Sequence, residues 1–314
     1  MKRVVWTAVL TLFVLATPAQ ESRTVYNFLR LPVSAHVAAL GGDNITISDD
    51  DPSLVFHNPA LINNVSDRSL GLNMMTYMEG SVTASASYLR AAGERASWGV
   101  AGQFMDYGTI KEANAYGEQT GDFHAKDISI SGTFGYALTN NISGGITAKV
   151  VTSYIGQYNS LATAVNLGLN YFDPESQWSV SAVARNLGGQ LKAYEDDFEP
   201  MPLDLQVGVS KRLVGSPLRF SASLVRLNDW QYGLGKHIVV GADILLSEQF
   251  YAAVGYNALR ASEMKISEDE GSSAHGAGLS IGAGLNLNRL KLNVAYAKYH
   301  VSASSLLVNV GYSL

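Results

Sequence analysis

The sequence predicts an all-β fold: a closed, membrane-crossing β-barrel of about fourteen antiparallel strands that follows an N-terminal segment without long strands. Three observations predict it. Apolar and polar residues alternate with a period of two from about Asp67 onward. The alternating runs are roughly ten to fifteen residues long, enough for a tilted strand to cross a bilayer and longer than most soluble strands. Short and long connections between the runs follow one another in turn.

The composition excludes several other classes of protein. Hydrophobic residues make up 47% of the 314 residues and charged residues only 16%, yet the mean hydropathy is near zero, too low for a bundle of membrane helices. Thirty Gly and sixteen Tyr against eight Pro favour sheet over helix. The net charge of −5 argues against nucleic-acid binding. Cysteine is absent, which excludes disulfides, Cys-ligated metals and lipid attachment through an N-terminal Cys.

The first nineteen residues have the pattern of a secretory signal peptide. Lys2 and Arg3 form a basic start, and an apolar run follows from Val4 to Ala16. Thr17-Pro18-Ala19 then offers small residues for cleavage. The apolar run is shorter than the about twenty residues that a membrane helix needs. We therefore interpret 1–19 as a signal peptide and expect the chain to be exported.

Each strand is predicted from its alternation. In one run, for example, Ile128 and Ile130 share a face opposite Asp127 and Ser129. The runs lie near 67–78, 81–92, 94–107, 124–138, 141–154, 161–173, 177–188, 202–214, 216–228, 236–247, 248–259, 273–287, 289–300 and 304–314. Because the pattern sets the facing of a whole strand, we expect lipid contact for Ile128, Ile146, Leu167, Val207, Leu279 and Val308.

The connections indicate which kind of barrel this is. Very short ones occur near Gly93, Thr139-Asn140, Gly215, Ser247-Glu248 and Asn288-Arg289, and longer loops are predicted at 108–123, 155–160, 189–201, 229–235 and 260–272. Outer-membrane barrels alternate tight periplasmic turns with longer external loops in this way. A soluble β-sandwich, the competing fold, has shorter strands and polar outer faces. The small polar residues on the second face favour a lumen.

Residues 20–66 differ from the rest of the chain. Gly41-Gly42, Asp49-Asp50-Asp51-Pro52 and Asn58-Pro59-Ala60 divide the segment into turns. Its apolar residues make a loose exposed tail costly. We expect 20–66 to fold back as a plug in or under the periplasmic mouth of a barrel formed by 67–314.

An ordered series of motifs in this segment resembles one family of outer-membrane barrels. The series comprises Tyr26 to Ala35, Ala38 to Gly42, Asp50 to Leu54, and Asn58 to Leu61. It is similar to the N-termini of the PorV/PorQ family of the type IX secretion system, which itself resembles the FadL long-chain fatty-acid channels. The matching positions include Gly41, Gly42, Asn58, Pro59 and Ala60. The remaining residues match in architecture and not in motif.

The resemblance implies a non-enzymatic anchor in the outer membrane. Such a protein holds a PorZ-like surface protein within an attachment complex that also contains PorU and PorV. Its partners would then be outer-membrane lipid and these surface proteins. The alternative is a FadL-like channel for hydrophobic small molecules, which would need an apolar lumenal pocket and a lateral opening, often made by a strand kink.

Two acidic loops are the candidate partner-binding sites. The carboxylates at issue are Glu195, Asp196, Asp197 and Glu199 in one loop and Glu263, Glu268, Asp269 and Glu270 in the other. Charged loops are often only solvated, but loops on a rigid scaffold also carry recognition.

No pattern predicts a catalytic residue, a cofactor or a metal. Gly278-Leu279-Ser280-Ile281-Gly282 matches the nucleophile-elbow spacing, but Ser280 lies inside a regular alternation with no helix after it. Asp49, Asp50 and Asp51 lack the mid-loop Gly and distal Glu of a calcium loop. A charged turn before Pro52 is the preferred interpretation, and an outer-membrane hydrolase is the disfavoured alternative.

Overall fold

The computed structural model describes residues 24–314, apart from 79, 115, 232, 248, 265, 269, 270, 274, 275, 301 and 302. The predicted signal peptide, 1–19, and the first residues of the predicted plug lie outside the described residues. No helix in the described part of the chain is both long and apolar enough to span a membrane.

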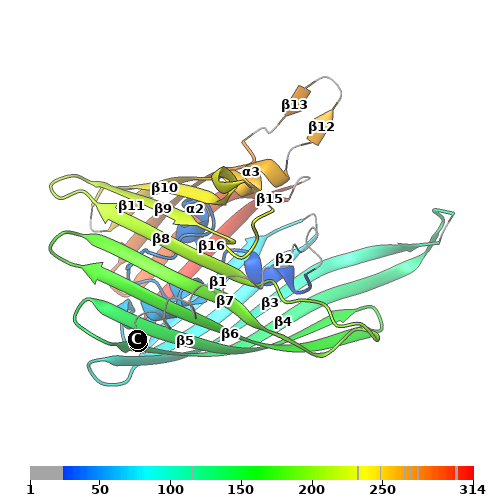
Figure 1. Cartoon of the computed structure of the whole chain (residues 1–314), viewed down its shortest axis with the longest axis horizontal. Coiled ribbons are helices and arrows are strands. Elements are labelled where there is room, and N and C mark those ends of the chain that lie inside the picture. Colours follow the sequence, from blue (N-terminus) through cyan, green and yellow to red (C-terminus); the bar gives the residue numbers. More distant parts are fainter. Residues whose placement is uncertain are drawn as a thin grey trace, which may run out of the picture.

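Fourteen antiparallel strands form one closed barrel in the described residues, and β1 pairs with β16 to close it (Figure 1). The strands are β1 (Ser69–Thr76), β2 (Val82–Ala91), β3 (Ala96–Ala113), β4 (Gln119–Ala137), β5 (Ile142–Ile155), β6 (Tyr158–Asp173), β7 (Trp178–Lys192), β8 (Asp204–Arg212), β9 (Leu218–Leu224), β10 (Ile238–Leu245), β11 (Phe250–Asn257), β14 (Leu279–Leu287), β15 (Leu290–His300) and β16 (Ala303–Ser313). A separate two-stranded hairpin, β12 (Ile266–Glu268) with β13 (Gly271–Ser273), projects from the barrel.

The predicted strand count and the fourteen predicted runs are confirmed, but two predicted loops are wrong. Residues 108–123 are mostly strand, because β3 and β4 continue to pair beyond a bulge at Gly108. Residues 155–160 hold a tight turn at Gly156, and Ile155 pairs directly with Tyr158. Polar residues in these stretches indicated loops, although a strand that extends past the apolar band can also be polar on both faces.

The outward face of the barrel is apolar. Ile130 is 67% exposed and Leu72 60%, and Ile146, Leu167, Val207, Leu279 and Val308 are exposed as predicted. Ile128 is only partly exposed, on the same face of β4 as Ile130. An apolar belt of this kind is stable in contact with hydrocarbon and costly in contact with water.

The inward face is polar and buried. It includes Ser129, Thr133, Thr147, Asn166 and Asn170, each less than a tenth exposed. Two of these pair directly, since the Thr133 and Thr147 hydroxyls lie 2.7 Å apart across β4 and β5. A membrane barrel has apolar residues outside and polar residues inside, as here, whereas a soluble barrel has the reverse arrangement.

The N-terminal segment, 24–66, lies within the ring of strands (Figure 1). It contains short helices only: η1 (Asn27–Arg30), α2 (Ala35–Ala39), η2 (Pro52–Phe56) and η3 (Pro59–Asn64). We call the end of the barrel where β1 begins and β16 ends the short-turn end, and the opposite end the long-loop end. The long-loop end also carries η4 (Leu234–His237) and α3 (Ala258–Glu263).

The segment runs along the lumen from one end of the barrel to the other. The Tyr26 hydroxyl lies 2.7 Å from that of Ser160, near the start of β6 at the long-loop end. Farther along, η3 packs against β4, β5 and β6 close to their short-turn ends. Whether the segment blocks the passage of solutes stays a prediction.

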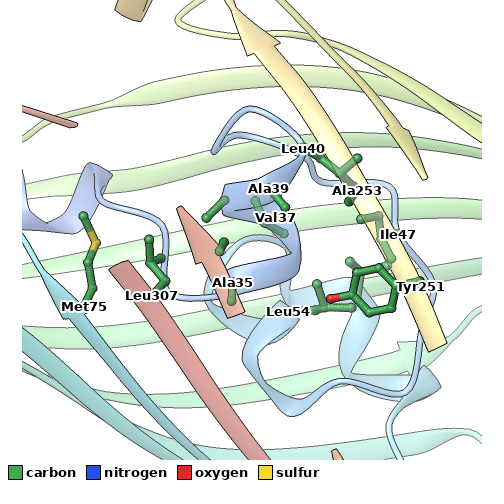
Figure 2. Close-up of a cluster of buried hydrophobic side chains, with 13 residues drawn as sticks. Ala35, Val37, Ala39, Leu40, Ile47, Leu54, Met75, Tyr251, Ala253 and Leu307 are labelled. Atoms are coloured by element: carbon green, nitrogen blue, oxygen red, sulfur yellow. The ribbon is translucent and has the colours of Figure 1, made fainter. Parts of the chain in front are cut away.

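An apolar core joins the segment to the wall (Figure 2). Val37, Leu40 and Leu54 from the segment pack with Tyr251 of β11 and Leu307 of β16, and all are buried. Burying a side chain of this size contributes about 1.5–3 kcal/mol. This cluster holds the segment against β11, β15 and β16 in particular.

We predict that Ile130→Arg destabilises the barrel by about 2–4 kcal/mol, because it places a charge in the middle of the apolar belt. Leu138→Arg, beside the turn between β4 and β5, is the matched control and should cost about 0–1 kcal/mol. Both native side chains are exposed, at 67% and 52%. Urea-dependent unfolding in phospholipid vesicles measures the difference. Equal losses would contradict the depth assigned to Ile130.

Candidate functional site

Polar side chains of the wall satisfy the backbone of the N-terminal segment. Asn309 of β16 donates to the Val33 carbonyl at 2.9 Å and accepts from the Ala35 N–H. Ser179 of β7 donates to the Thr46 carbonyl at 2.7 Å. Arg185 of β7 donates to the Leu29 carbonyl at 2.8 Å. A buried irregular segment needs such partners for its N–H and C=O groups, so the polar inner face has a structural role.

Gly41 and Gly42 occupy positions that exclude other residues. Their φ angles are 104° and 97°, a region that L side chains rarely adopt. A Cβ on Gly41 would lie 2.4 Å from the Val239 side chain, and one on Gly42 would lie 2.8 Å from the Tyr299 hydroxyl. The pair allows the chain to turn after α2 while touching the wall.

Asn58-Pro59-Ala60 starts η3 and seats it on two wall glycines. Asn58 Oδ1 accepts from the Ala60 N–H at 3.0 Å, and its amide donates to the Ile45 carbonyl at 3.0 Å. A Cβ on Gly168 would lie 2.2 Å from Asn58 Oδ1, and one on Gly145 would lie 2.3 Å from Pro59. These motif residues therefore cap a helix and pack closely against the wall, and their geometry indicates a structural role.

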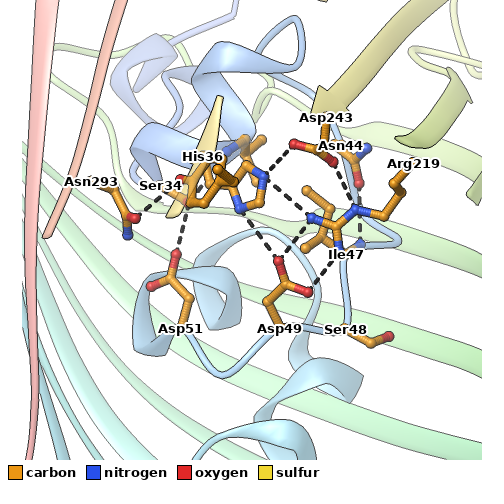
Figure 3. Close-up of polar contacts among 12 residues, drawn as sticks. Ser34, His36, Asn44, Ile47, Ser48, Asp49, Asp51, Arg219, Asp243 and Asn293 are labelled. Carbon is orange, nitrogen blue, oxygen red and sulfur yellow. Dashed lines mark hydrogen bonds and ion pairs between the residues drawn. The ribbon is translucent and has the colours of Figure 1, made fainter. Parts of the chain in front are cut away.

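A network of charges ties the segment to β9 and β10 (Figure 3). Arg219 of β9 contacts Asp49 through two N–O distances of 2.7 and 2.9 Å and Asp243 of β10 at 2.7 Å. His36 of α2 lies between them, with Nε2 2.7 Å from Asp243 and Nδ1 3.5 Å from Asp49. Burial alone raises the pKa of the Asp49 carboxyl, but Arg219 outweighs it and holds this pKa at about 2.

The three consecutive aspartates each have a different partner. Asp49 binds Arg219, Asp50 contacts Lys291 of β15 at 2.5 Å, and Asp51 accepts from the Ser53 N–H and hydroxyl. Their carboxylates are therefore used separately, and no group of His, Asp and Glu suited to a metal ion occurs among the described residues. The interpretation as a charged turn fits this arrangement.

A pocket of 340 Å³ opens at the long-loop end, between the segment and the wall. We call it the mouth pocket. Its apolar lining includes Leu31, Pro32, Val225, Leu259, Met264, Tyr77 and Tyr299, and its charged lining comprises Arg30, Asp43, Asp204, Arg226, Arg260 and Glu263. The volume lies within the usual range for small-molecule sites.

Arg30 is the charged residue of the mouth pocket with unused hydrogen-bonding capacity. Its buried Nε has no partner among the described residues. The other two arginines are engaged: Arg226 contacts Glu263 at 2.7 Å, and Arg260 donates to the carbonyls of Ala277 and Gly278. Arg260 also stacks on Tyr299, with 4.6 Å between the guanidinium and the ring centre. Arg30 therefore has a donor that no described group uses.

The wall is irregular where β6 meets β7. Asn186 has a φ of 60°, and the pairing of the two strands shifts between Val165 and Leu167. Asn186 is held by the Asn166 side chain at 2.8 Å and by the Pro202 carbonyl at 3.0 Å. A bulge of this kind bends the strand locally.

The described members of the predicted partner-binding set lie in three separate places. Glu195, Asp196, Asp197 and Glu199 gather around a 400 Å³ hollow with Ile155, Tyr158 and Tyr194 at the long-loop end. Glu263 instead ends α3 and contacts Arg226 in the mouth pocket. Glu268 lies in the projecting β12, while Asp269 and Glu270 lie outside the described residues.

Ser280 lies within regular strand β14, as its alternation predicted. It is 2% exposed, and its hydroxyl accepts from Arg260 at 3.2 Å. The mouth pocket itself was not predicted from the sequence. Arg30 ends η1, and only the close approach of 27–32 to 257–264 makes these residues neighbours.

We predict that Arg219→Met loosens the N-terminal segment and destabilises the protein by about 3–5 kcal/mol, because it leaves buried Asp243 beside Asp49 without their shared cation. Asp243 is 1% exposed. Arg289→Met, in an exposed turn at the same end, is the control and should change stability by about 0.5 kcal/mol or less. Unfolding in urea and protease cleavage within 24–66 provide the measurements. Similar behaviour of the two variants would refute the role of the network.

The fold is similar to that of several solved channels. A FadL homologue from Pseudomonas aeruginosa is 10% identical, with a TM-score of 0.54 over 90% of this chain and 98% of that one. The toluene transporter TodX of Pseudomonas putida is 12% identical, with a TM-score of 0.55 over 90% and 96%. The monoaromatic hydrocarbon channel CymD is 14% identical, with a TM-score of 0.56 over 90% and 97%. No protein-family model and no curated protein matches the chain. The similarity shows a FadL-like outer-membrane β-barrel fold.

Proposed function

We propose that this protein is an outer-membrane channel that admits small hydrophobic molecules carrying a polar or anionic group. The mouth pocket carries the proposal. It combines an apolar lining with one arginine, Arg30, whose Nε has no protein partner. A ligand that places its apolar part against Leu31, Leu259 and Met264 would offer an acceptor to Arg30.

The way in which a ligand could leave the mouth pocket also supports a channel. The mouth pocket is bounded by Leu31 and Pro32 of the N-terminal segment, so a ligand must either displace the segment or leave sideways. The bulge at Asn186 is one of the irregularities in the wall, and we assign the sideways exit to it. Toluene and monoaromatic hydrocarbons are named as the cargo of two proteins that share the fold.

We expect the purified protein in detergent to bind a fatty acid such as oleate and, in vesicles, to speed its entry. Arg30→Met should weaken oleate binding by about tenfold or more, since a hydrogen bond to a charged group contributes about 1.5–3 kcal/mol. Arg90→Met, on the exposed outer face of β2, is the control and should leave binding unchanged. Toluene, which has no acceptor, should bind both variants equally. Isothermal titration measures the affinities.

Two outcomes would contradict the channel proposal. One is the absence of binding of both oleate and toluene to the wild-type protein. The other is vesicle uptake of either compound no faster than in protein-free vesicles. Binding that is unaffected by Arg30→Met would leave a channel but remove the assigned site.

A second candidate function is the anchoring of a surface protein, as in the attachment complex of type IX secretion. The hollow formed by Glu195, Asp196, Asp197 and Glu199 favours it, because four carboxylates and two tyrosines share one exposed surface at the long-loop end. Such a surface suits a partner with a basic patch, and tyrosine is enriched at protein interfaces. Membership of the PorV/PorQ family and the PorZ-like, PorU and PorV partners stay predictions.

Affinity purification from outer membranes tests the anchor. We expect the tagged wild-type protein to retain large surface proteins, and a variant with all four loop carboxylates changed to the corresponding amides to lose them. Asp173→Asn with Glu175→Gln, in a turn at the short-turn end, is the control. Mass spectrometry identifies what is retained. Equal retention by the two variants, or retention of no protein by the wild type, would count against the anchor.

A further inference from the structure

A small cavity lies deep in the lumen, apart from the mouth pocket. Its walls combine inward side chains of β3 to β7 with six residues of the segment: Leu29, Leu31, Val33, Val55, Phe56 and His57. The charged members are Lys149 and Arg185. We call it the wall cavity. Its volume is about 20 Å³, room for about one water molecule or a small ion. An acyl chain or an aromatic ring does not fit.

The charge of the wall cavity is unbalanced. Lys149 of β5 and Arg185 of β7 both line it, and no described lining residue is Asp or Glu. Arg185 is 5% exposed, so water does little to stabilise its charge. Buried charges are ordinarily paired, because the loss of hydration costs several kcal/mol for each ion. A compensating negative charge would therefore stabilise two cations that face one cavity.

The donors of both cations are only partly used. Lys149 Nζ donates to Asn186 Oδ1 at 2.9 Å, and Arg185 Nη2 donates to the Leu29 carbonyl at 2.8 Å. The buried Nε of Arg185 has no partner among the described residues. A lysine ammonium carries three donors and a guanidinium five, so each side chain has donors to spare for an anion.

His57 adds a third donor. Its ring is 1% exposed, and Nε2 accepts from the N–H groups of Val33 and Ser34 at 3.3 and 3.2 Å. Burial, and then the charge of Arg185, hold the pKa of His57 well below its ordinary value, so the ring is neutral. With Nε2 accepting, the proton of a neutral ring is on Nδ1. That N–H has no partner among the described residues, although it is buried.

We propose that the wall cavity binds one small monovalent anion of the halide class, held by Lys149, Arg185 and the Nδ1–H of His57. A water molecule would satisfy the hydrogen bonds but not the charges. An anion satisfies both, and it joins β5, β7 and the N-terminal segment at one point. Its binding stabilises the seated segment in proportion to the logarithm of the anion concentration above its Kd. This inference is independent of the proposed channel.

The test uses the full-length protein in detergent at constant ionic strength, with chloride replaced stepwise by gluconate. Gluconate is too large for the cavity. The thermal midpoint should rise with chloride or bromide, by about 3 °C for each tenfold increase above the Kd. Crystals grown in bromide should show an anomalous peak between Lys149, Arg185 and His57.

Two variants separate the site from general salt effects. Lys149→Met should remove the chloride dependence, measured as the difference between that variant's own midpoints in chloride and in gluconate, because it removes one of the two cations that hold the anion. Lys126→Met, on the exposed outer face of β4, should keep the full chloride dependence. The proposal is overturned if the wild-type midpoint is equal in chloride and gluconate, if Lys149→Met keeps the dependence, or if bromide is found only at the surface.

Discussion

The structure depends on hydrogen bonding between an irregular chain segment and the barrel that surrounds it. Residues 24–66 contain only short helices, so many of their backbone groups lie outside regular secondary structure. Such groups are costly to bury unless something else pairs with them. Asn309 of β16 and Ser179 and Arg185 of β7 supply such partners from two strands. The polar inner face is therefore needed to seat the segment, whatever passes through the lumen.

The same constraint accounts for the charges in the lumen. Arg219, Asp243, Asp49 and His36 form a network in which Arg219 faces two carboxylates, and it holds the segment near the short-turn end. Lys149 and Arg185 lie nearer the middle of the wall and face no carboxylate in their cavity. The balanced network is a structural contact, whereas the unbalanced pair of buried cations is the basis of the proposed anion site. We therefore assign the Arg219 network to anchoring of the segment, and Lys149 with Arg185 to the proposed binding of an anion.

The two candidate functions draw on different surfaces of one fold. The mouth pocket lies between the segment and the wall and has an apolar lining with a spare arginine donor. The acidic hollow lies on the loop between β7 and β8, with its carboxylates directed to the exterior surface around Tyr158 and Tyr194. A barrel fold serves both roles, because function resides in the site and not in the fold. Uptake and partner retention are consequently separable properties.

By itself, the sequence determined the barrel. Fourteen runs of period-two alternation specify which residues face outward, since a slip of one residue would reverse every side chain of a strand. The special backbone at Gly41-Gly42 and the turn at Asn58-Pro59-Ala60 were also visible as motifs, although not the contacts that make them necessary. Only the tertiary structure determined which residues come together in the mouth pocket and in the wall cavity. Arg30 meets 257–264, and His57 meets Lys149 and Arg185, only because the segment folds back through the closed barrel. Periodicity reports the facing of a residue within its own strand, and it carries no information about which distant residue lies opposite across the lumen.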